Sequence, residues 1–515
     1  MDATTLPASV ASTEAAPPPP PGAELSDPAL RGLLPEHIGH RYQAVPLRRE
    51  NGELIVGMVN PGDLRAVDDL RALLDERFTR VPITATQLAD LLGERRKLDQ
   101  EVNNVAQIVV DDSFDEQTDL ATLRAVVEEA PIVKFVNLII LQAVQERASD
   151  IHVEPTEHDL RIRYRIDGVL HERMRQPRAI IPGVISRLKV MADIDIAERR
   201  VPKDGRISLT VDGAVVDLRV STLPTVHGEK IVMRILDRAS SVQSLASLGF
   251  LPSQLAQYEH SFRKPYGAIL VTGPTGSGKT TTLYATLNLL NLESRNIVTV
   301  EDPVEYRLAN VNQVQTNPKA GLTFANALRS ILRQDPDIIL VGEIRDRETG
   351  VIAIEAALTG HLVLTTLHTN DAPSTPLRLI EMGIEPFLVT SAVDCVLAQR
   401  LARRLCDRCK VPFVPTELEL SSAKWDFSRH SIEGLVFYRG VGCPQCGGTG
   451  YRGRLAIHEV MLMSEELDKL VVSRASSEDV RRCAAEQGMM DLRSDGLAKV
   501  ALGLTTLSEV SRVVA

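Results

Sequence analysis

The stretch GPTGSGKT, residues Gly273–Thr280, decides the fold of this chain. It fits the pattern Gly-x4-Gly-Lys-Ser/Thr, in which backbone N–H groups of a glycine-rich turn surround phosphate groups at the N-terminus of a helix. The run AILVT precedes the motif and TTLYATLNLL follows it, so the required strand and helix are present. The pattern predicts that Lys279 reaches the β- and γ-phosphates and that the Thr280 hydroxyl holds Mg²⁺. The predicted nucleotide-contacting residues are Gly273, Pro274, Thr275, Gly276, Ser277, Gly278, Lys279, Thr280 and Thr281.

The sequence around this motif alternates between strand-like and helix-like runs from Tyr266 to about Leu405. Such alternation builds a parallel sheet covered by helices, so we predict an α/β fold with a P-loop core. The carboxyl ends of the strands then meet at one edge, where ligands bind.

Acidic residues follow two of the strand-like runs. NIVTVEDPVEY carries Glu301 and Asp302 after a β-rich run, and DPDIILVGEIRD places Glu343 after the apolar run IILV. Both glutamates are candidates for orienting Mg²⁺ or the attacking water, and the pattern leaves open which one polarises the water. For Glu301 and Asp302 the alternative is a solvated turn.

The next strand-like run, LVLTTL, is flanked by His361 and His368. A single histidine is more often structural than catalytic. Each of these flanks an end of the strand that we expect on the nucleotide side, so both are candidate catalytic residues.

Composition and periodicity divide the rest of the chain. A Pro- and Ala-rich start predicts a disordered tail, and a segment with closely spaced acids predicts a linker. Short β-rich runs around one amphipathic helix predict a small α/β domain, and we expect this domain to bind a partner. The expected segments are the tail (1–24), the small α/β domain (25–95), the acidic linker (96–129), an α+β domain (130–240) and the nucleotide-binding domain (241–515), which includes a cysteine-bearing insert (400–450) and a helical C-terminal tail.

The α+β domain is rich in arginine. Most of these side chains are expected on solvated strand faces. An arginine on a separate domain of a nucleotide-hydrolysing chain can also reach a neighbouring subunit's γ-phosphate, because the planar guanidinium binds phosphate oxygens as a fork. Composition does not choose among Arg161, Arg163, Arg165, Arg187, Arg199, Arg200, Arg206, Arg219 and Arg234.

Four of the six cysteines form two Cys-x2-Cys pairs, Cys406 with Cys409 and Cys443 with Cys446. Paired spacing of this kind favours a metal site over four ordinary buried thiols. Because all four positions are cysteine, we expect a closed structural Zn²⁺ site rather than a catalytic one.

The composition limits the possible partners. Lys and Arg number 58 against 68 Asp and Glu, which gives a net charge of −10, and only 4% of residues are aromatic. A protein that neutralises nucleic-acid phosphates or stacks on bases usually shows the opposite balance. The chain has no apolar run of membrane-spanning length and begins without an export signal, so we expect it in the cytosol.

The four motifs in this order resemble those of the hexameric secretion ATPase family that drives bacterial type II secretion and type IV pilus assembly. GPTGSGKT matches the family's Walker A motif, TVEDPVEY its Asp box, DPDIILVGEIRD its Walker B motif and TGHLVLTTLHTNDA its His box. The resemblance covers residues 130–515 densely and 27–92 more loosely. It implies a RecA-like P-loop NTPase core, a homohexameric ring, and hydrolysis of ATP with Mg²⁺.

The resemblance also assigns roles to individual residues. DIAERRVPKDGR and VDLRVSTLP match the domain that precedes the motor, which implies that Arg206 and Arg219 touch a neighbour's nucleotide. The family's zinc knuckle matches the four paired cysteines. The pilus-assembly branch of the family is favoured by three segments, APIVKFVNLI, NPKAGLTFANALRS and HTNDAPST. The four-cysteine insert argues for a motor that extrudes a fibre rather than one that retracts it. Residues 1–92 match only the later half of an N-terminal domain that carries a cyclic-dinucleotide signature, so we do not expect such regulation.

The implied partners are an inner-membrane platform protein and the cytoplasmic domain of a membrane-anchored assembly protein. The implied location is cytoplasmic, peripheral at the inner face of the plasma membrane. Type II secretion proper is the alternative branch. A RecA-like DNA motor with a zinc ribbon is a distant alternative, against which the net charge counts. A scaffold with an inactive nucleotide site conflicts with Lys279, Thr280, Glu301 and Glu343 all being present.

Overall fold

The computed structural model describes residues 30, 33–34, 38–39, 42–50, 53–74, 76–83, 88, 130–211, 214–236, 244–425 and 435–514. The predicted tail (1–24) and acidic linker (96–129) lie outside the described residues.

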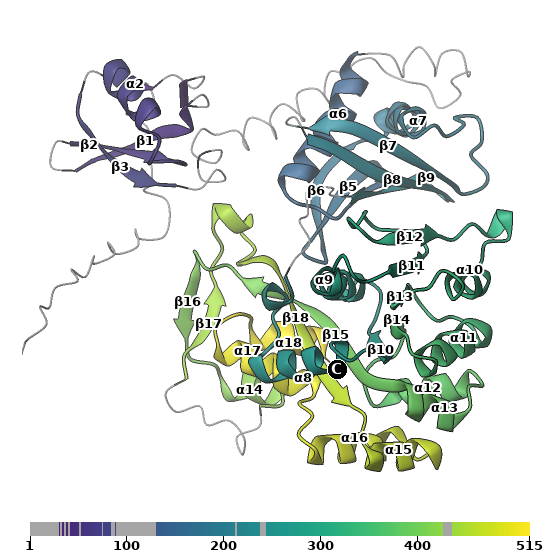
Figure 1. Cartoon of the computed structure of the whole chain (residues 1–515). Helices are drawn as coiled ribbons and strands as arrows, with labels where there is room; N and C mark the ends of the chain where they lie inside the picture. The colour runs from purple at the N-terminus through teal and green to yellow at the C-terminus, as the bar shows by residue number, and fades with distance from the viewer. Residues whose placement is uncertain are drawn as a thin grey trace, which may run out of the picture. The chain divides into compact units, whose positions relative to one another are not determined.

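The N-terminal part contains a three-stranded sheet of β1 (Ala44–Glu50), β2 (Glu53–Met58) and β3 (Phe78–Pro82) (Figure 1). β1 and β2 pair antiparallel. β2 and β3 pair parallel, and helix α2 (Leu64–Leu74) connects them along the chain. Val56 and Met58 on the sheet are fully buried with Leu70 on the helix. The small α/β fold predicted for this segment is confirmed.

The α+β domain has two helices on one face of a six-stranded sheet (Figure 1). The strands follow the order β6-β5-β4-β9-β8-β7 and all neighbours pair antiparallel. Its elements are α6 (Ala130–Gln145), β4 (Asp150–Pro155), β5 (Asp159–Ile166), β6 (Val169–Pro177), η2 (Arg178–Ile180), α7 (Ile181–Met191), β7 (Lys203–Val211), β8 (Ala214–Thr225) and β9 (Gly228–Leu236).

Alternation along the strands separates an apolar face from a charged one. In β5, Leu160, Ile162 and Tyr164 are buried in the cluster that includes residues of both helices. Successive side chains of a strand point to opposite faces, so the arginines between them lie on the other face. This explains why the sequence DLRIRYRI alternates between apolar and basic residues.

The core that carries the Gly273–Thr280 motif is built on a seven-stranded sheet of order β12-β11-β13-β14-β10-β15-β18. All neighbours pair parallel except β15 and β18. The strands are β10 (Gly267–Thr272), β11 (Ile297–Glu301), β12 (Asn312–Gln315), β13 (Ile338–Val341), β14 (Leu362–Leu367), β15 (Val393–Leu405) and β18 (Tyr451–Leu462). The predicted parallel α/β core is confirmed.

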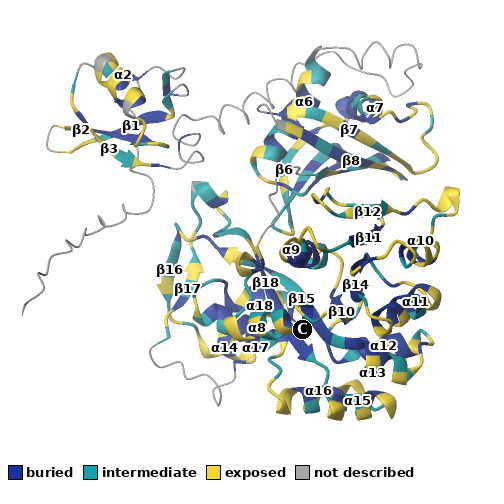
Figure 2. Ribbon diagram, viewed as in Figure 1, coloured by how far each residue is buried: buried dark blue, intermediate teal, exposed yellow. Residues whose placement is uncertain are grey.

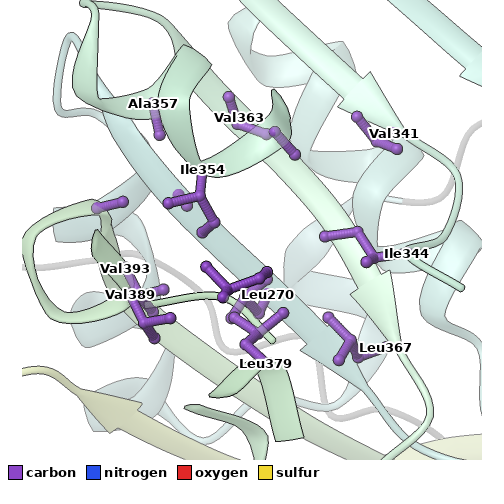
Figure 3. Close-up of a cluster of buried hydrophobic side chains, with 14 of the residues drawn as sticks. Leu270, Val341, Ile344, Ile354, Ala357, Val363, Leu367, Leu379, Val389 and Val393 are labelled. Carbon is purple, nitrogen blue, oxygen red and sulfur yellow. The ribbon is translucent and has the colours of Figure 1, made fainter. Parts of the chain in front are cut away.

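Helices cover both faces of this sheet, and two hydrophobic clusters fill the space between the layers. Figure 3 shows part of one cluster, where Leu270 of β10 lies beside Ile354 and Leu379. Figure 2 shows that the central strands are buried, which explains their continuous apolar runs. The helical elements of the core are η3 (Leu245–Leu248), α8 (Pro252–Phe262), α9 (Lys279–Leu290), η4 (Pro318–Ala320), α10 (Phe324–Ile331), α11 (Arg347–Leu358), α12 (Ser374–Glu381) and α13 (Pro386–Ala392).

The cysteine-bearing insert lies between β15 and β18, and a helical tail follows β18. The insert contains β16 (Lys410–Phe413), α14 (Glu417–Ser422), β17 (Phe437–Gly440) and η5 (Pro444–Cys446). The tail contains α15 (Glu465–Val472), α16 (Ser477–Glu486), α17 (Leu492–Ala501) and α18 (Leu507–Val513).

Candidate active site

The P-loop joins the end of β10 to the start of α9. Gly273, Gly276 and Gly278 have φ of 142°, 79° and 88°, which side chains with a Cβ rarely adopt. Three glycines therefore let the backbone turn sharply and present its N–H groups at the N-terminus of α9.

Packing leaves one side of this loop open. A Cβ atom at Gly273 would lie 2.4 Å from the Gln399 carbonyl oxygen, whereas one at Gly276 would meet nothing within 4 Å. The buried Ser277 Oγ has no hydrogen-bond partner among the described residues. A glycine turn that is open at Gly276 and lies at a helix N-terminus fits a phosphate group, which supplies acceptor oxygens for the backbone N–H groups.

Lys279 lies over the loop. Its Nζ donates to the carbonyl oxygens of Gly273 and Pro274, at 2.8 and 3.1 Å. Burial lowers the pKa of the Lys279 ammonium, and the nearby Glu343 carboxylate partly offsets this. The Lys279 ammonium is thus bound to the loop carbonyls and attracted by the Glu343 carboxylate.

Glu343 follows β13 and is mostly buried. Its Oε1 accepts a hydrogen bond from Arg345 at 2.5 Å, and its Oε2 lies 3.4 Å from His368 Nε2. Burial alone would raise the pKa of Glu343, but hydrogen bonds from Arg345 and His368 hold it below the usual range. The structure therefore brings Lys279, Glu343 and His368 together with Glu343 ionised.

Glu301 has different partners. It is 3% exposed and accepts hydrogen bonds from Tyr284, from Thr299 Oγ1 at 2.6 Å and from Gln313 Nε2 at 3.2 Å. The solvated turn considered for Glu301 does not occur. Tyr284 and Gln313 come from α9 and β12, and no sequence motif indicates either of them.

The placement of His361 on the nucleotide side is wrong. β14 runs parallel to β10 in the register Gly267 with Leu362 and Thr272 with Leu367. His368 therefore follows the strand at the edge that carries the P-loop, whereas His361 precedes it at the opposite edge. His361 Nδ1 lies 2.9 Å from the Ala356 carbonyl oxygen, at the end of α11.

The two arginines assigned by resemblance are neighbours on the charged face of the α+β domain. Arg206 of β7 pairs in register with Arg219 of β8. Arg219 Nη2 donates to the Val304 carbonyl oxygen at 3.4 Å, and its Nη1 lies 3.9 Å from Glu305. Arg206 is exposed.

The structure adds two residues that sequence reasoning missed. Gln399 donates from Nε2 to the Ser277 carbonyl oxygen at 2.9 Å and accepts from Thr282 Oγ1 at 2.8 Å. Arg400 donates to the Asn370 carbonyl oxygen at 2.8 Å. The sequence signal that could have indicated these two residues is the polar pair Gln-Arg, which directly follows the apolar run VLA in β15.

The paired cysteines form a single cluster, in which the four Sγ atoms lie within 4.8 Å of one another. Cys446 Sγ is 3.8 Å from Cys409 Sγ and 3.7 Å from Cys443 Sγ. Four sulfurs bound tetrahedrally at about 2.3 Å from Zn²⁺ are about 3.8 Å apart. The donor set and its spacing therefore fit a structural zinc knuckle.

Among the described residues, no helix combines the length and the apolar character needed to cross a bilayer.

Two family models match this sequence. The model described as "Type II/IV secretion system protein" matches residues 125–512, and the model described as "MshEN domain" matches residues 17–102.

Curated relatives match nearly the whole chain. The type IV pilus assembly ATPase PilB of Myxococcus xanthus is 46% identical over 94% of this chain and 86% of its own length. The type II secretion system protein E of Xanthomonas campestris is 43% identical over 94% of this chain and 85% of its own length.

A solved structure has a similar fold. The ATPase DotB of Legionella pneumophila aligns with a TM-score of 0.54 over 74% of this chain and 95% of its own, at 21% identity.

Proposed function

Because the chain belongs to the type II/IV secretion system family of ATPases, we propose that it is a homohexameric motor that uses ATP hydrolysis to add pilin subunits to a type IV pilus. The observation that supports pilus assembly is the likeness to PilB, which is 46% identical over 94% of this chain, against 43% for the protein E relative over the same share. Type II secretion is the second candidate, since the protein E relative matches over the same share of the chain with nearly equal identity.

In the proposed mechanism the P-loop binds the phosphates of ATP. Its backbone N–H groups donate to phosphate oxygens, and Lys279 exchanges its carbonyl partners for the β- and γ-phosphates. Thr280 with Glu301 or Glu343 would hold Mg²⁺, which neutralises charge on the phosphates. Of the two acids, we favour Glu343 as the residue that orients the attacking water, because its carboxylate lies 3.4 Å from His368 and its charge acts on the Lys279 ammonium.

Hydrolysis in the proposed ring involves two subunits. Arg206 and Arg219 lie on a domain separate from the P-loop, and we propose that they stabilise charge on a neighbour's γ-phosphate. A change in nucleotide state would then alter the angle between the two domains. The four-cysteine cluster is proposed to hold Zn²⁺ and stiffen the insert.

The proposed motor acts at the cytoplasmic face of the inner membrane, through a membrane platform protein and the cytoplasmic domain of a membrane-anchored assembly protein. Nucleic acid is not an expected partner, because the net charge is −10.

Deleting the gene in its own host distinguishes pilus assembly from type II secretion. Loss of surface pili with normal protein export supports pilus assembly, and the reverse supports type II secretion. Stimulation of ATP turnover by DNA, and not by membranes containing the platform protein, would contradict both.

A further inference from the structure

The segment after β14, His368 to Ala372, has the sequence HTNDA and contacts a different part of the core at each position. We call it the HTNDA loop. Its first two residues contact the nucleotide site. His368 lies 3.4 Å from Glu343, and the Thr369 N–H donates at 2.9 Å to Thr272 Oγ1, one residue before the P-loop. The loop therefore touches both the P-loop strand and the acid that follows β13.

The other end of the loop contacts elements that follow β14 in the chain. Asp371 Oδ2 accepts a hydrogen bond from Arg481 Nη2 of α16 at 2.7 Å. Ala372 N–H donates to Glu459 Oε1 of β18 at 2.7 Å, and the other carboxylate oxygen of Glu459 accepts from the first N–H of α17, that of Leu492, at 3.2 Å. Residues more than 85 positions away thus hold the loop.

The Asp371–Arg481 pair is half-buried, and Asp371 is tied to its own segment as well. Its Oδ1 accepts from the Ser374 N–H at 2.9 Å, which fixes the start of α12. The relative exposures of the Arg481 and Asp371 side chains are 36% and 21%, so solvent screens this pair less than a fully exposed one. A charged hydrogen bond in this setting restricts where the loop can lie.

We propose that Arg481 is a positioning residue for ATP hydrolysis, which holds Asp371 and thereby keeps His368 and Thr369 against Glu343 and Thr272. The nucleotide site then depends on α16, a helix outside the parallel sheet. This inference rests on the proposed role of Glu343 and His368 in hydrolysis.

The test compares kcat and KM for ATP in the full-length protein. Arg481→Ala should lower kcat about tenfold and leave KM nearly unchanged, because small misplacement of a catalytic loop affects the transition state more than ground-state binding. Arg481→Lys should recover part of the loss, since the charge returns without the planar fork. Asp371→Asn should lower kcat similarly, and the double variant Asp371→Asn/Arg481→Ala should be no worse than either single one.

Arg482→Ala is the matched control. Arg482 is the next residue of α16, and it pairs at 2.6 Å with Asp479 of the same helix. It should keep the wild-type kcat. All variants are compared at equal hexamer content, and each melting temperature is measured.

Wild-type kcat in Arg481→Ala, with or without a lower melting temperature, would overturn the inference. A loss in Arg482→Ala equal to that in Arg481→Ala would do the same. If Arg481→Ala fails to assemble, Asp371→Asn is the deciding variant: a lowered kcat supports the inference and a wild-type kcat overturns it. An inactive wild-type protein would instead contradict the proposed function, so the two failures are distinguishable.

Discussion

Glu343 is a mostly buried carboxylate whose neighbours keep it ionised. Its neighbours Arg345 and His368 hold its pKa below the usual range despite burial, so it is an anion at neutral pH. Glu343→Gln keeps the shape and removes the charge, so the variant should bind ATP while kcat falls by about a hundredfold or more. Nucleotide binding and single-turnover hydrolysis measure the two effects separately. Loss of binding together with loss of the fold would show that Glu343 is structural.

The sequence predicts the P-loop at the residue scale because its glycines and lysine are required by local geometry. The environments of the acids could not be predicted in the same way. Glu301 is the last residue of a buried strand and Glu343 follows one, but Glu301 is hydrogen-bonded to Tyr284 and Gln313, which come from other elements. His361 was misplaced because the pattern shows a strand between two histidines without showing which end meets the P-loop.

The four-cysteine insert is the element that we propose a bound Zn²⁺ stabilises. Cys406→Ser would leave three thiolates and an open position, so zinc content should fall towards zero and the insert should loosen. Elemental analysis and limited proteolysis measure these two results. ATP turnover should change only indirectly. Absence of zinc from the purified wild-type protein would contradict the assignment.

Strand β18 carries a buried acid whose charge depends on pH. Burial, aided by the charge of Asp371, raises the pKa of Glu459 to about 7, although N–H groups of Ala372 and Leu492 bond to it. A carboxyl group with a raised pKa stabilises the fold below its unfolded pKa of about 4.5, and this stabilisation is lost as pH rises to about 7.

Glu459→Gln removes this dependence because the amide stays neutral. The melting temperature of the wild type minus that of Glu459→Gln should therefore fall by several degrees as pH rises from about 5 to about 8, since one pKa unit corresponds to about 1.4 kcal/mol. Thermal unfolding at both pH values checks this. A difference that does not change with pH would show that Glu459 has an ordinary pKa.

At the scale of elements, periodicity predicts the parallel strands around the P-loop because they are continuous apolar runs. The antiparallel pairing of β15 with β18 was not predicted, since the insert separates them in the sequence. The contacts of Gln399 and Arg400 were not predicted either, because their partners Ser277 and Asn370 lie on earlier segments that only the folded sheet brings close.

The proposed ring makes a prediction for the whole molecule. If Arg219 acts on a neighbour's nucleotide, Arg219→Ala should bind ATP nearly normally and lose most of its turnover, because an arginine finger acts mainly on transition-state charge. Mixing Arg219→Ala subunits with Lys279→Ala subunits should restore some hydrolysis, since an intact arginine can then face an intact P-loop. Both variants must assemble and exchange subunits. If they do, and no mixture regains activity, Arg219 does not act between subunits.

The proposed function requires that this chain hydrolyses ATP at the P-loop. Steady-state hydrolysis of ATP with Mg²⁺, measured on the full-length protein and on Lys279→Ala, tests it most directly. Lys469→Ala, which removes an exposed lysine of α15, is the control. We expect hydrolysis by the wild type and the control, and a loss of about a hundredfold or more in Lys279→Ala with the fold retained. Wild-type turnover in a folded Lys279→Ala variant, or no turnover in the wild type, would contradict it.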